Sequence, residues 1–135
     1  MLPLVKPDGF GCVITQDQLL VTLPPPHPAL HAHNNGHWRK KSPFVWSLRQ
    51  MAVEACRSVA GLNWQQVRLH YQFVFCDRKR RDVANCIQSL KPAVDGIVDA
   101  GVIPDDNYQH LIIGSATCLV EPANPRTVLT FERLG

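Results

Sequence analysis

The sequence lacks the patterns that mark several common classes of protein. No apolar run is long enough to cross a membrane, and no basic segment followed by an apolar stretch begins the chain. Its five cysteines are odd in number and contain no Cys-x-x-Cys pair, which argues against a disulfide framework or a zinc ribbon. A Gly-rich phosphate loop and a serine or cysteine nucleophile constellation are also missing. We therefore expect a soluble protein of the reducing cytoplasm, without a membrane partner.

A strong charge of one sign is missing as well. The formal net charge is +3, and 45% hydrophobic against 19% charged residues is typical of one ordinary globular domain of 135 residues. The cations are nevertheless clustered, because seven of the fourteen lysines and arginines lie in two short runs. Each run alone is compatible with a solvated loop, but Asp82 follows the second directly, which makes that run a candidate phosphate contact. The two runs consist of Arg39, Lys40 and Lys41, and of Arg78, Lys79, Arg80 and Arg81.

The hydrophobic pattern predicts a single α+β domain over residues 1–135, with a mixed β-sheet and two main helices packed on it. Alternation of apolar and polar residues marks the strands, and apolar residues three and four apart mark the helices. Pro92 either kinks the second helical segment or begins a new helix. The expected elements are a loose lead-in at 1–9, strands at 12–15 and 19–23, a Pro- and His-rich loop at 24–41, a helix at 42–60, a strand at 67–75, a helical segment at 83–100, and strands at 111–120 and 127–131.

The first helix is expected to begin at Ser42, because serine caps helix N-termini and Pro43 then falls where proline is tolerated. Gly61 is expected to end it. One face of this helix should pack on the core. The residues of that face are Val45, Leu48, Met51, Ala52 and Cys56.

Carboxylates, a lysine and basic residues gather between residues 80 and 106. Mg²⁺ is commonly held by one or two carboxylates, several waters and the phosphates of the substrate. Neighbouring cations neutralise a nucleic-acid backbone, and a lysine can stabilise the charge that develops on a phosphate. The pattern therefore suits magnesium-dependent cleavage of a phosphodiester. The residues concerned are Arg80, Arg81, Asp82, Asn85, Lys91, Asp95, Asp105 and Asp106.

Each of these residues also has a plainer interpretation. Asp82 is equally able to cap a helix by accepting the N–H of Asn85. The two aspartates at 105–106 suit a simple turn. Lys91 and Asp95 lie four residues apart and suit an ion pair on the face of one helix. The residues alone do not decide between these alternatives.

Four histidines occupy the loop at 24–41. Their spacing is one at which Zn²⁺ or Ni²⁺ can bind, but no cysteine or carboxylate lies near them. We expect these imidazoles and Trp38 to line a loop that faces DNA, and the alternative is that Trp38 anchors the loop to the core. The histidines are His27, His31, His33 and His37.

The run from residue 80 to residue 106 resembles the signature of the RusA family of Holliday-junction resolvases, small endodeoxyribonucleases often carried by phages. The family pattern is a basic run, Asp-x-Asp-Asn, a helical Lys-Pro, an aspartate in the next turn and an Asp-Asp pair after the helix. The segments around Val21–Pro26, Asn34 and His37–Lys41 are similar to the opening strand and loop of the family, so the likeness covers roughly residues 19–132. The matching motif positions are Arg80, Arg81, Asp82, Asn85, Lys91, Pro92, Asp95, Asp105 and Asp106.

The sequence departs from the family pattern in two places. Ala84 stands where the family has the second aspartate of its motif, a metal-site carboxylate, so a single or weaker metal site and reduced turnover are expected. Lys91 also lies further from Asp82 than the lysine of shorter members does. Since Pro92 and Asp95 keep their spacing to the lysine, we interpret this difference as a short insertion.

The resemblance implies a homodimer that binds a branched, four-way DNA junction and nicks two symmetry-related strands in recombination and repair. It implies Mg²⁺ or Mn²⁺ as the cofactor, and Asp82, Lys91 and Asp106 as catalytic residues. The metal is expected at Asp82 and Asp106, with Asp105 and Asp95 as a further ligand or an outer carboxylate. DNA contacts are expected from Trp38, Arg39, Lys40, Lys41, Arg78, Lys79, Arg80, Arg81 and Asn85.

Two alternatives remain open. One is a junction-binding protein whose metal site is impaired because Ala84 replaces a carboxylate. The other is an unrelated small α+β binding module, for which the spacing of the aspartates would be a coincidence.

Overall fold

A strand of alternating apolar residues lies inside the sheet. In the computed structural model, which describes residues 10–27, 30 and 38–135, β3 (Val67–Phe75) buries every second side chain along most of its length. It lies between β4 (Leu111–Val120), which runs parallel to it, and β5 (Arg126–Arg133), which runs antiparallel. β2 (Gln18–Leu23) pairs with β5, and β1 (Gly11–Ile14) pairs with β2. The order β1-β2-β5-β3-β4 confirms the predicted mixed sheet, and the two N-terminal strands form an antiparallel hairpin.

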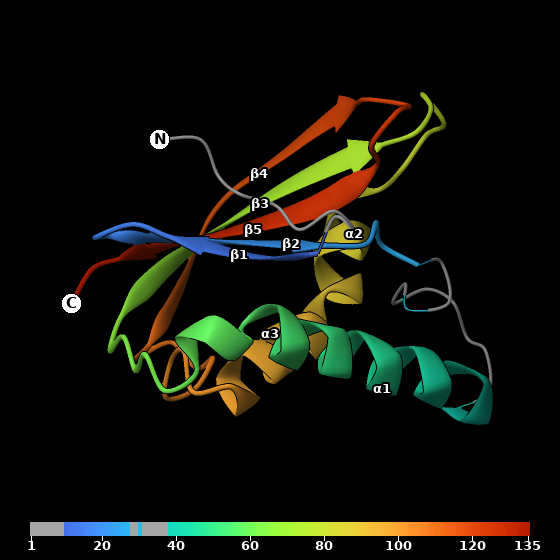
Figure 1. The fold of residues 1–135 in the computed structure, drawn as a ribbon. Coiled ribbons are helices and arrows are strands. Elements are labelled where there is room, and N and C mark those ends of the chain that lie inside the picture. Colours follow the sequence, from blue (N-terminus) through green and yellow to red (C-terminus); the bar gives the residue numbers. More distant parts are fainter. Residues whose placement is uncertain (1–9, 28–29, 31–37) are drawn as a thin grey trace.

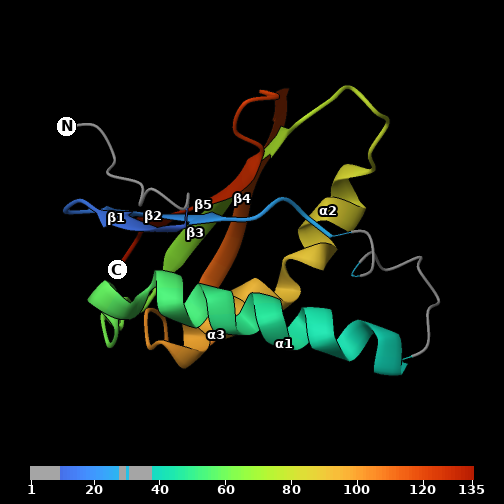
Figure 2. The ribbon, with the colours of Figure 1, turned by 45° about the vertical axis from the view of Figure 1, so that its right-hand side comes forward.

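The helices cover one face of this sheet (Figures 1 and 2). α1 (Trp38–Ala55) packs against α3 (Lys91–Asp99), while α2 (Val83–Ser89) leads from the loop after β3 down to α3. Pro92 lies in the first turn of α3, where its missing N–H costs no hydrogen bond. Of the two possibilities for Pro92, the structure therefore has the one in which a new helix begins. The result is one α+β domain, as predicted.

The predicted bounds of the first helix were wrong at both ends. α1 begins at Trp38 rather than at Ser42, so Pro43 is its sixth residue. A proline at this position cannot donate to the carbonyl oxygen four residues earlier and also crowds it, and the other hydrogen bonds of the 18-residue helix hold the helix together around it. The helix ends at Ala55, after which the chain tightens into a short 3-10 helix (Arg57–Val59).

The core face of α1 also differs from the prediction at two positions, Val45 and Met51, of which Val45 is half-buried and lies outside the core cluster. Ala52 and Cys56 are fully buried and Leu48 packs against the core, but Met51 is 37% exposed. Ala55, which was not predicted on this face, is buried instead. Met51 had the correct helical spacing, but it lies at the margin of the apolar stripe, where spacing alone does not distinguish a buried from an exposed side chain.

The two main helices approach each other closely at a glycine. A Cβ atom on Gly96 of α3 would overlap the carbonyl oxygen of Arg49 and would lie 2.9 Å from Cβ of Ala52. Beside this contact, Arg49 of α1 forms a two-pronged ion pair with Asp99 of α3, with Nε–Oδ2 and Nη2–Oδ1 distances of 2.5 and 2.9 Å. These contacts fix the position of α3, and therefore of the residues at its N-terminus.

Two further features of the described residues concern membrane-spanning helices and cysteines. None of the helices there combines the length and the apolar character that crossing a membrane requires. All five cysteines are unpaired. Cys56 and Cys86 are buried, and burial raises the pKa of Cys56 to about 12, whereas Cys118 is exposed on β4.

Candidate functional site

Lys91 joins two of the predicted carboxylates. Its ammonium group donates to Oδ1 of Asp95 at 2.7 Å, one turn further along α3. It also forms a close ion pair with Asp106, which lies in the turn before β4. The predicted ion pair with Asp95 is therefore present, but Lys91 is shared with a residue from a different part of the chain. We name Lys91, Asp95 and Asp106 the lysine–aspartate cluster.

The cluster is electrostatically coupled. The hydrogen bond from Lys91, together with its charge, holds the pKa of Asp106 below its usual value despite partial burial. Burial lowers the pKa of Lys91, but the hydrogen bonds and charges of Asp106 and Asp95 outweigh burial and raise it overall. Two carboxylates and one ammonium leave the cluster with a net negative charge at neutral pH. A site of this charge attracts cations.

A pocket of about 610 Å³ opens beside the cluster. Lys91, Asp106 and Gln88 supply its polar groups, and the remaining wall is apolar. The apolar wall comes from β3, β4, α2, α3 and the short turn at Leu30, including Leu69 and Ile113. Its volume is in the range of ligand sites, and a few convergent polar groups in an apolar wall are typical of them. This pocket and the lysine–aspartate cluster form the candidate site.

Tyr71 and Gln88, two residues of this pocket with polar groups, were not predicted as site residues. Tyr71 of β3 is buried against the site, where burial raises its pKa to about 12 with smaller opposing influences from Lys91 and Asp106. Alternation along β3 correctly predicted that Tyr71 faces the interior. What it could not show is that Lys91 and Asp106 lie close to the same position, because this depends on how α3 crosses the sheet.

Asp82 lies at the other end of α2 and caps that helix. Its Oδ1 atom accepts the backbone N–H groups of Ala84 at 2.9 Å and Asn85 at 3.4 Å. This is the plainer role considered from the sequence. α2 has seven residues and is about 10 Å long, so it separates Asp82 from Lys91. Among the described residues no hydrogen bond or ion pair joins Asp82 to the cluster.

Asp105 is engaged in its own turn. Its carboxylate accepts the backbone N–H of Asp106 at 2.7 Å and the side-chain amide of Asn107 at 3.2 Å. This turn fixes the direction of Asp106 toward Lys91. Asp105 is exposed and makes these contacts within the turn, so it lies next to the lysine–aspartate cluster and is not part of it. The structure thus brings together Asp95 and Asp106 of the four predicted metal carboxylates.

The basic run after β3 is an ordered loop with one structural arginine. Arg81 pairs with Asp77 at 2.7 Å, donates to the carbonyl oxygens of Asp77 and Lys79, and lies 4.2 Å above the ring of Phe75. The backbone N–H of Lys79 and then Arg81 lower the pKa of Asp77. Asp77 was not singled out from the sequence, although its spacing of four from Arg81 was a usable signal. Arg81 holds the loop rather than projecting from it.

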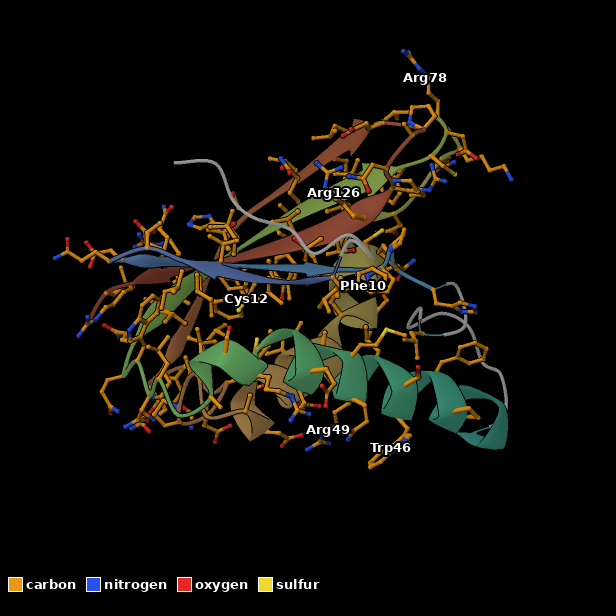
Figure 3. The ribbon with its side chains drawn as sticks, viewed as in Figure 1. Phe10, Cys12, Trp46, Arg49, Arg78 and Arg126 are labelled. Carbon is orange, nitrogen blue, oxygen red and sulfur yellow. The ribbon has the colours of Figure 1, made fainter. Side chains whose placement is uncertain are left out.

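The other cations of this loop are free to meet a ligand. Arg78, Lys79 and Arg80 are exposed, and Arg78 projects away from the molecule at the end of the sheet (Figure 3). A second pocket of about 320 Å³ lies between this loop and the end of β4. The loop is thus a compact positive surface beside the N-terminus of α2.

Part of the predicted DNA surface lies outside the described residues. The side chains of Trp38, Arg39, Lys40 and Lys41 are not among those described, although the backbone there forms the first turn of α1. Asn34, His31, His33 and His37 lie outside them altogether. His27 is described, and its ring stacks on Phe44 of α1 with ring centroids 4.2 Å apart.

The donors of the cluster suit a hard cation, but they form a small set. Within the described part of the chain, no three His, Cys, Asp or Glu side chains lie close enough to hold a metal ion together. Mg²⁺ needs only one or two carboxylates where water and phosphate complete its shell. The ammonium of Lys91 already lies between the two carboxylates, in a position that favours positive charge. Asp95 and Asp106 therefore fit a weakly held divalent ion.

Comparison with known proteins adds no functional assignment. No known family profile and no curated protein matches the sequence. Among solved structures, the periplasmic domain of Helicobacter pylori MotB is 13% identical, with 98% of this chain and 88% of that chain covered and a TM-score of 0.43. A putative translation initiation inhibitor from Salmonella typhimurium is 10% identical, with 98% and 96% covered and a TM-score of 0.31. Phosphoribosylformylglycinamidine synthase II from Thermotoga maritima is 14% identical, with 93% and 20% covered and a TM-score of 0.28. At these TM-scores the likenesses define neither a fold family nor a function.

Proposed function

We propose that the protein is a RusA-like, metal-dependent endodeoxyribonuclease that resolves four-way DNA junctions by paired nicks. It would act as a homodimer in the cytoplasm, where it meets DNA during recombination and repair. A junction with two-fold symmetry presents two equivalent strands, and a symmetric dimer presents two equivalent sites.

One observation carries this proposal. Lys91, Asp95 and Asp106 are three positions of the RusA-like motif, and they meet in one cluster although Asp106 comes from a turn beyond α3. A surface ion pair within one helix would need only Lys91 and Asp95. The third member adds an acidic group to a lysine at the mouth of a pocket, an arrangement that suits phosphate chemistry.

Asp106 and Asp95 would hold the Mg²⁺ or Mn²⁺ ion, with Asp105 as an outer carboxylate. Asp82, about 10 Å away along α2, would reach this ion only across the DNA phosphate, and Ala84 leaves that end of the site without a second carboxylate. When bound, such an ion activates water and neutralises charge on the phosphate. Hydrolysis adds the oxygen of water to phosphorus and releases the leaving oxygen, so negative charge grows on the phosphate. Lys91, freed from one of its carboxylates when a cation neutralises them, would stabilise that charge through its ammonium group.

The loop after β3 would bind the DNA backbone. Arg78, Lys79 and Arg80 are exposed, and Arg81 fixes the loop that presents them. Each phosphate contact releases counterions, so DNA binding should weaken steeply as salt concentration rises. The first basic run, Arg39 to Lys41, would extend this surface.

A second candidate is a junction-binding protein with an impaired metal site. The observation that favours it is the N-terminus of α2, where Asp82 is engaged as a cap and Ala84 supplies no carboxylate. The basic contacts would be the same in both candidates. They differ only in whether the remaining carboxylates support cleavage.

Cleavage of a mobile four-way junction tests the proposal, beside linear duplex of the same sequence and with or without Mg²⁺ or Mn²⁺. Paired metal-dependent nicks in the junction, lost in Asp106→Asn, are the expected result. Asp17→Asn is the matched control, because Asp17 is an exposed aspartate in the turn between β1 and β2 and takes no part in the proposed site. Tight junction binding without nicks would favour the second candidate, and neither binding nor cleavage would overturn both.

A further inference from the structure

β4 is a long edge strand with no neighbour on its outer side in the described structure. It is ten residues long and pairs only with β3, at the end of the strand order (Figure 1). Its backbone therefore presents a row of N–H and C=O groups that are free to pair with another strand. Along most of β4 the side chains of both faces are exposed.

Proteins usually protect such edges, and the protective feature that β4 has is a bulge in its middle. Charged residues and prolines also discourage pairing between edge strands, yet Leu-Ile-Ile-Gly-Ser-Ala-Thr-Cys-Leu-Val contains neither. Ile112 and Ile113 near its start are 39% and 52% exposed, and Leu119 and Val120 at its end are 38% and 40% exposed. Apolar side chains are thus exposed at both ends of an edge that carries no charge.

A bulge in the middle of β4 decides which side chains share a face. Between its pairs with Leu69 and Tyr71 of β3, the strand advances from Ile113 to Ala116, one residue more than its neighbour. His70 holds the bulge by accepting the N–H of Ser115 at 3.1 Å. As a result Ile113 and Ala116 both face the helix side of the sheet.

Gly114 makes this bulge possible. A Cβ atom there would lie 2.5 Å from the ring of His70. Because of the extra residue, odd-numbered side chains before the bulge and even-numbered side chains after it point to the same face of the sheet. Leu111, Ile113, Cys118 and Val120 share the helix-side face, while Ile112 and Leu119 share the other face.

We propose that β4 pairs antiparallel with β4 of a second copy of this chain, about a two-fold axis that passes beside Ala116. In this register the bulge of one copy lies opposite Thr117 of the other. All other side chains meet a partner on their own face, as opposed residues in antiparallel strands must. The pairs are Leu111 with Val120, Ile112 with Leu119, Ile113 with Cys118, and Ala116 with its own copy.

The apolar pattern of β4 is complementary to itself in this register. Each exposed apolar residue near the start of one strand meets an apolar residue or Cys118 near the end of the other. No like charges lie opposite each other, because β4 contains no charged residue. A two-fold axis uses the same surface on both copies, and this surface fits that requirement.

The charges beyond the two ends of β4 are complementary as well. The turn before β4 carries Asp105 and Asp106, whereas the loop beside its far end carries the cations of residues 78–81, and Glu121 directly after β4 is neutralised by its ion pair with Arg126. Antiparallel pairing brings the acidic end of one copy toward the basic end of the other. Attraction between them would act over a distance comparable with the Debye length.

This inference develops the homodimer of the proposed function by naming its surface. Because the two-fold axis is perpendicular to the sheet, both helical layers and both pockets lie on the same face of a continuous ten-stranded sheet. Ile113 lines the pocket and also belongs to the pairing strand, so each site would adjoin the interface. The basic loop of one copy would then lie at the same end of the paired strands as the lysine–aspartate cluster of the other copy.

The molar mass in solution, measured without DNA, tests the pairing independently of cleavage. Wild type should have twice the chain mass of 15.1 kDa. Ile112→Glu with Leu119→Glu places carboxylates opposite each other and should give monomers, whereas Ile112→Glu with Leu119→Lys places opposite charges together and should restore the dimer. A monomeric wild type, or a Glu/Glu variant that folds and remains dimeric, would overturn the inference whether or not the protein cuts DNA.

A cysteine cross-link tests the register even if the charged variants fail to fold. With Cys76→Ser and Cys118→Ser as the background, Ala116→Cys faces its own copy at a distance that a disulfide can span. Oxidation should convert it to a covalent dimer. Thr117→Cys in the same background lies opposite the bulge and should remain uncross-linked. Equal cross-linking at both positions, or none at Ala116→Cys, would contradict the proposed axis.

Discussion

Asp82 caps α2 in the structure, and one pair of substitutions can separate this role from the proposed role at the metal site. As the N-cap of α2 it accepts two backbone N–H groups, and asparagine caps a helix about as well as aspartate. Asp82→Ala should lower the free energy of unfolding by about 1 kcal/mol, while Asp82→Asn should stay within a few tenths. Chemical denaturation measures both.

Metal-dependent cleavage provides the second readout for these variants. If the Asp82 carboxylate also serves the metal, both variants should lose activity although only one loses stability. Full cleavage by Asp82→Asn would show that the carboxylate is only a cap.

The ion pair between Lys91 and Asp106 should make stability depend on pH. The pKa of Asp106 is lowered by folding, so its contribution is present above its unfolded pKa of about 4 and is lost as pH falls through the folded pKa. The pKa of Lys91 is raised, so its contribution is lost only at strongly alkaline pH. The Lys91 side chain is 60% exposed, which limits the effect to about 1 kcal/mol or less.

The difference in unfolding free energy between wild type and Asp106→Asn, followed from neutral to acid pH, measures this effect. It should be largest near neutrality and should shrink below about pH 4. The same substitution in a Lys91→Met background should lose most of that pH dependence. A difference that grows on acidification would contradict the ion pair.

At the scale of elements, the contact between α1 and α3 depends on Gly96. Alanine is the better helix former by about 1 kcal/mol, so Gly96→Ala would stabilise an isolated helix. Here its Cβ would overlap the carbonyl oxygen of Arg49, and overpacking of this kind costs about 1–3 kcal/mol or more. We expect a net loss of stability and displacement of Lys91 at the start of α3.

Thermal unfolding measures the effect of Gly96→Ala. Gly135→Ala is its control, because an added Cβ there meets nothing within 4 Å. A higher melting temperature for Gly96→Ala would show that the helices separate easily.

The elements could largely be predicted because their signals are local. Alternation along residues 67–75 identified β3, and apolar residues at helical spacing identified the helical segment at 83–100, although its division into α2 and α3 was left open. The start of α1 could not be predicted, since Ser42 followed by Pro43 is a strong start signal that an earlier helical turn overrides. The edge position of β4 could not be predicted either, because the strand order depends on how all five strands pair.

The same distinction applies to the candidate site. The ion pair of Lys91 with Asp95 follows from a spacing of four residues on one helix. The contact between Lys91 and Asp106 depends on how the turn after α3 returns to the sheet, which no local pattern encodes. Asp82 and Asp106 were expected to share a metal, whereas Asp82 caps α2 and Asp106 pairs with Lys91.

At the scale of the whole molecule, the proposed nuclease combines a basic loop, an acidic cluster and a surface for a second copy. In this proposal the loop would supply affinity for DNA, the cluster would supply the chemistry, and pairing through β4 would supply the symmetry that a four-way junction requires. Substitution at Ala84 tests the proposed nuclease function most directly. Ala84 lies in the first turn of α2, where an added carboxylate would be favourable to the helix.

The most direct test of the account is therefore junction cleavage by Ala84→Asp beside wild type, in Mn²⁺ and in Mg²⁺, with junction affinity measured in parallel. We predict a gain in paired nicks on the order of 10-fold or more, which corresponds to about 1.4 kcal/mol of transition-state stabilisation, at nearly unchanged affinity. If both proteins bind the junction and neither nicks it with either metal, residues 82–106 are not a nuclease site and the central claim is wrong.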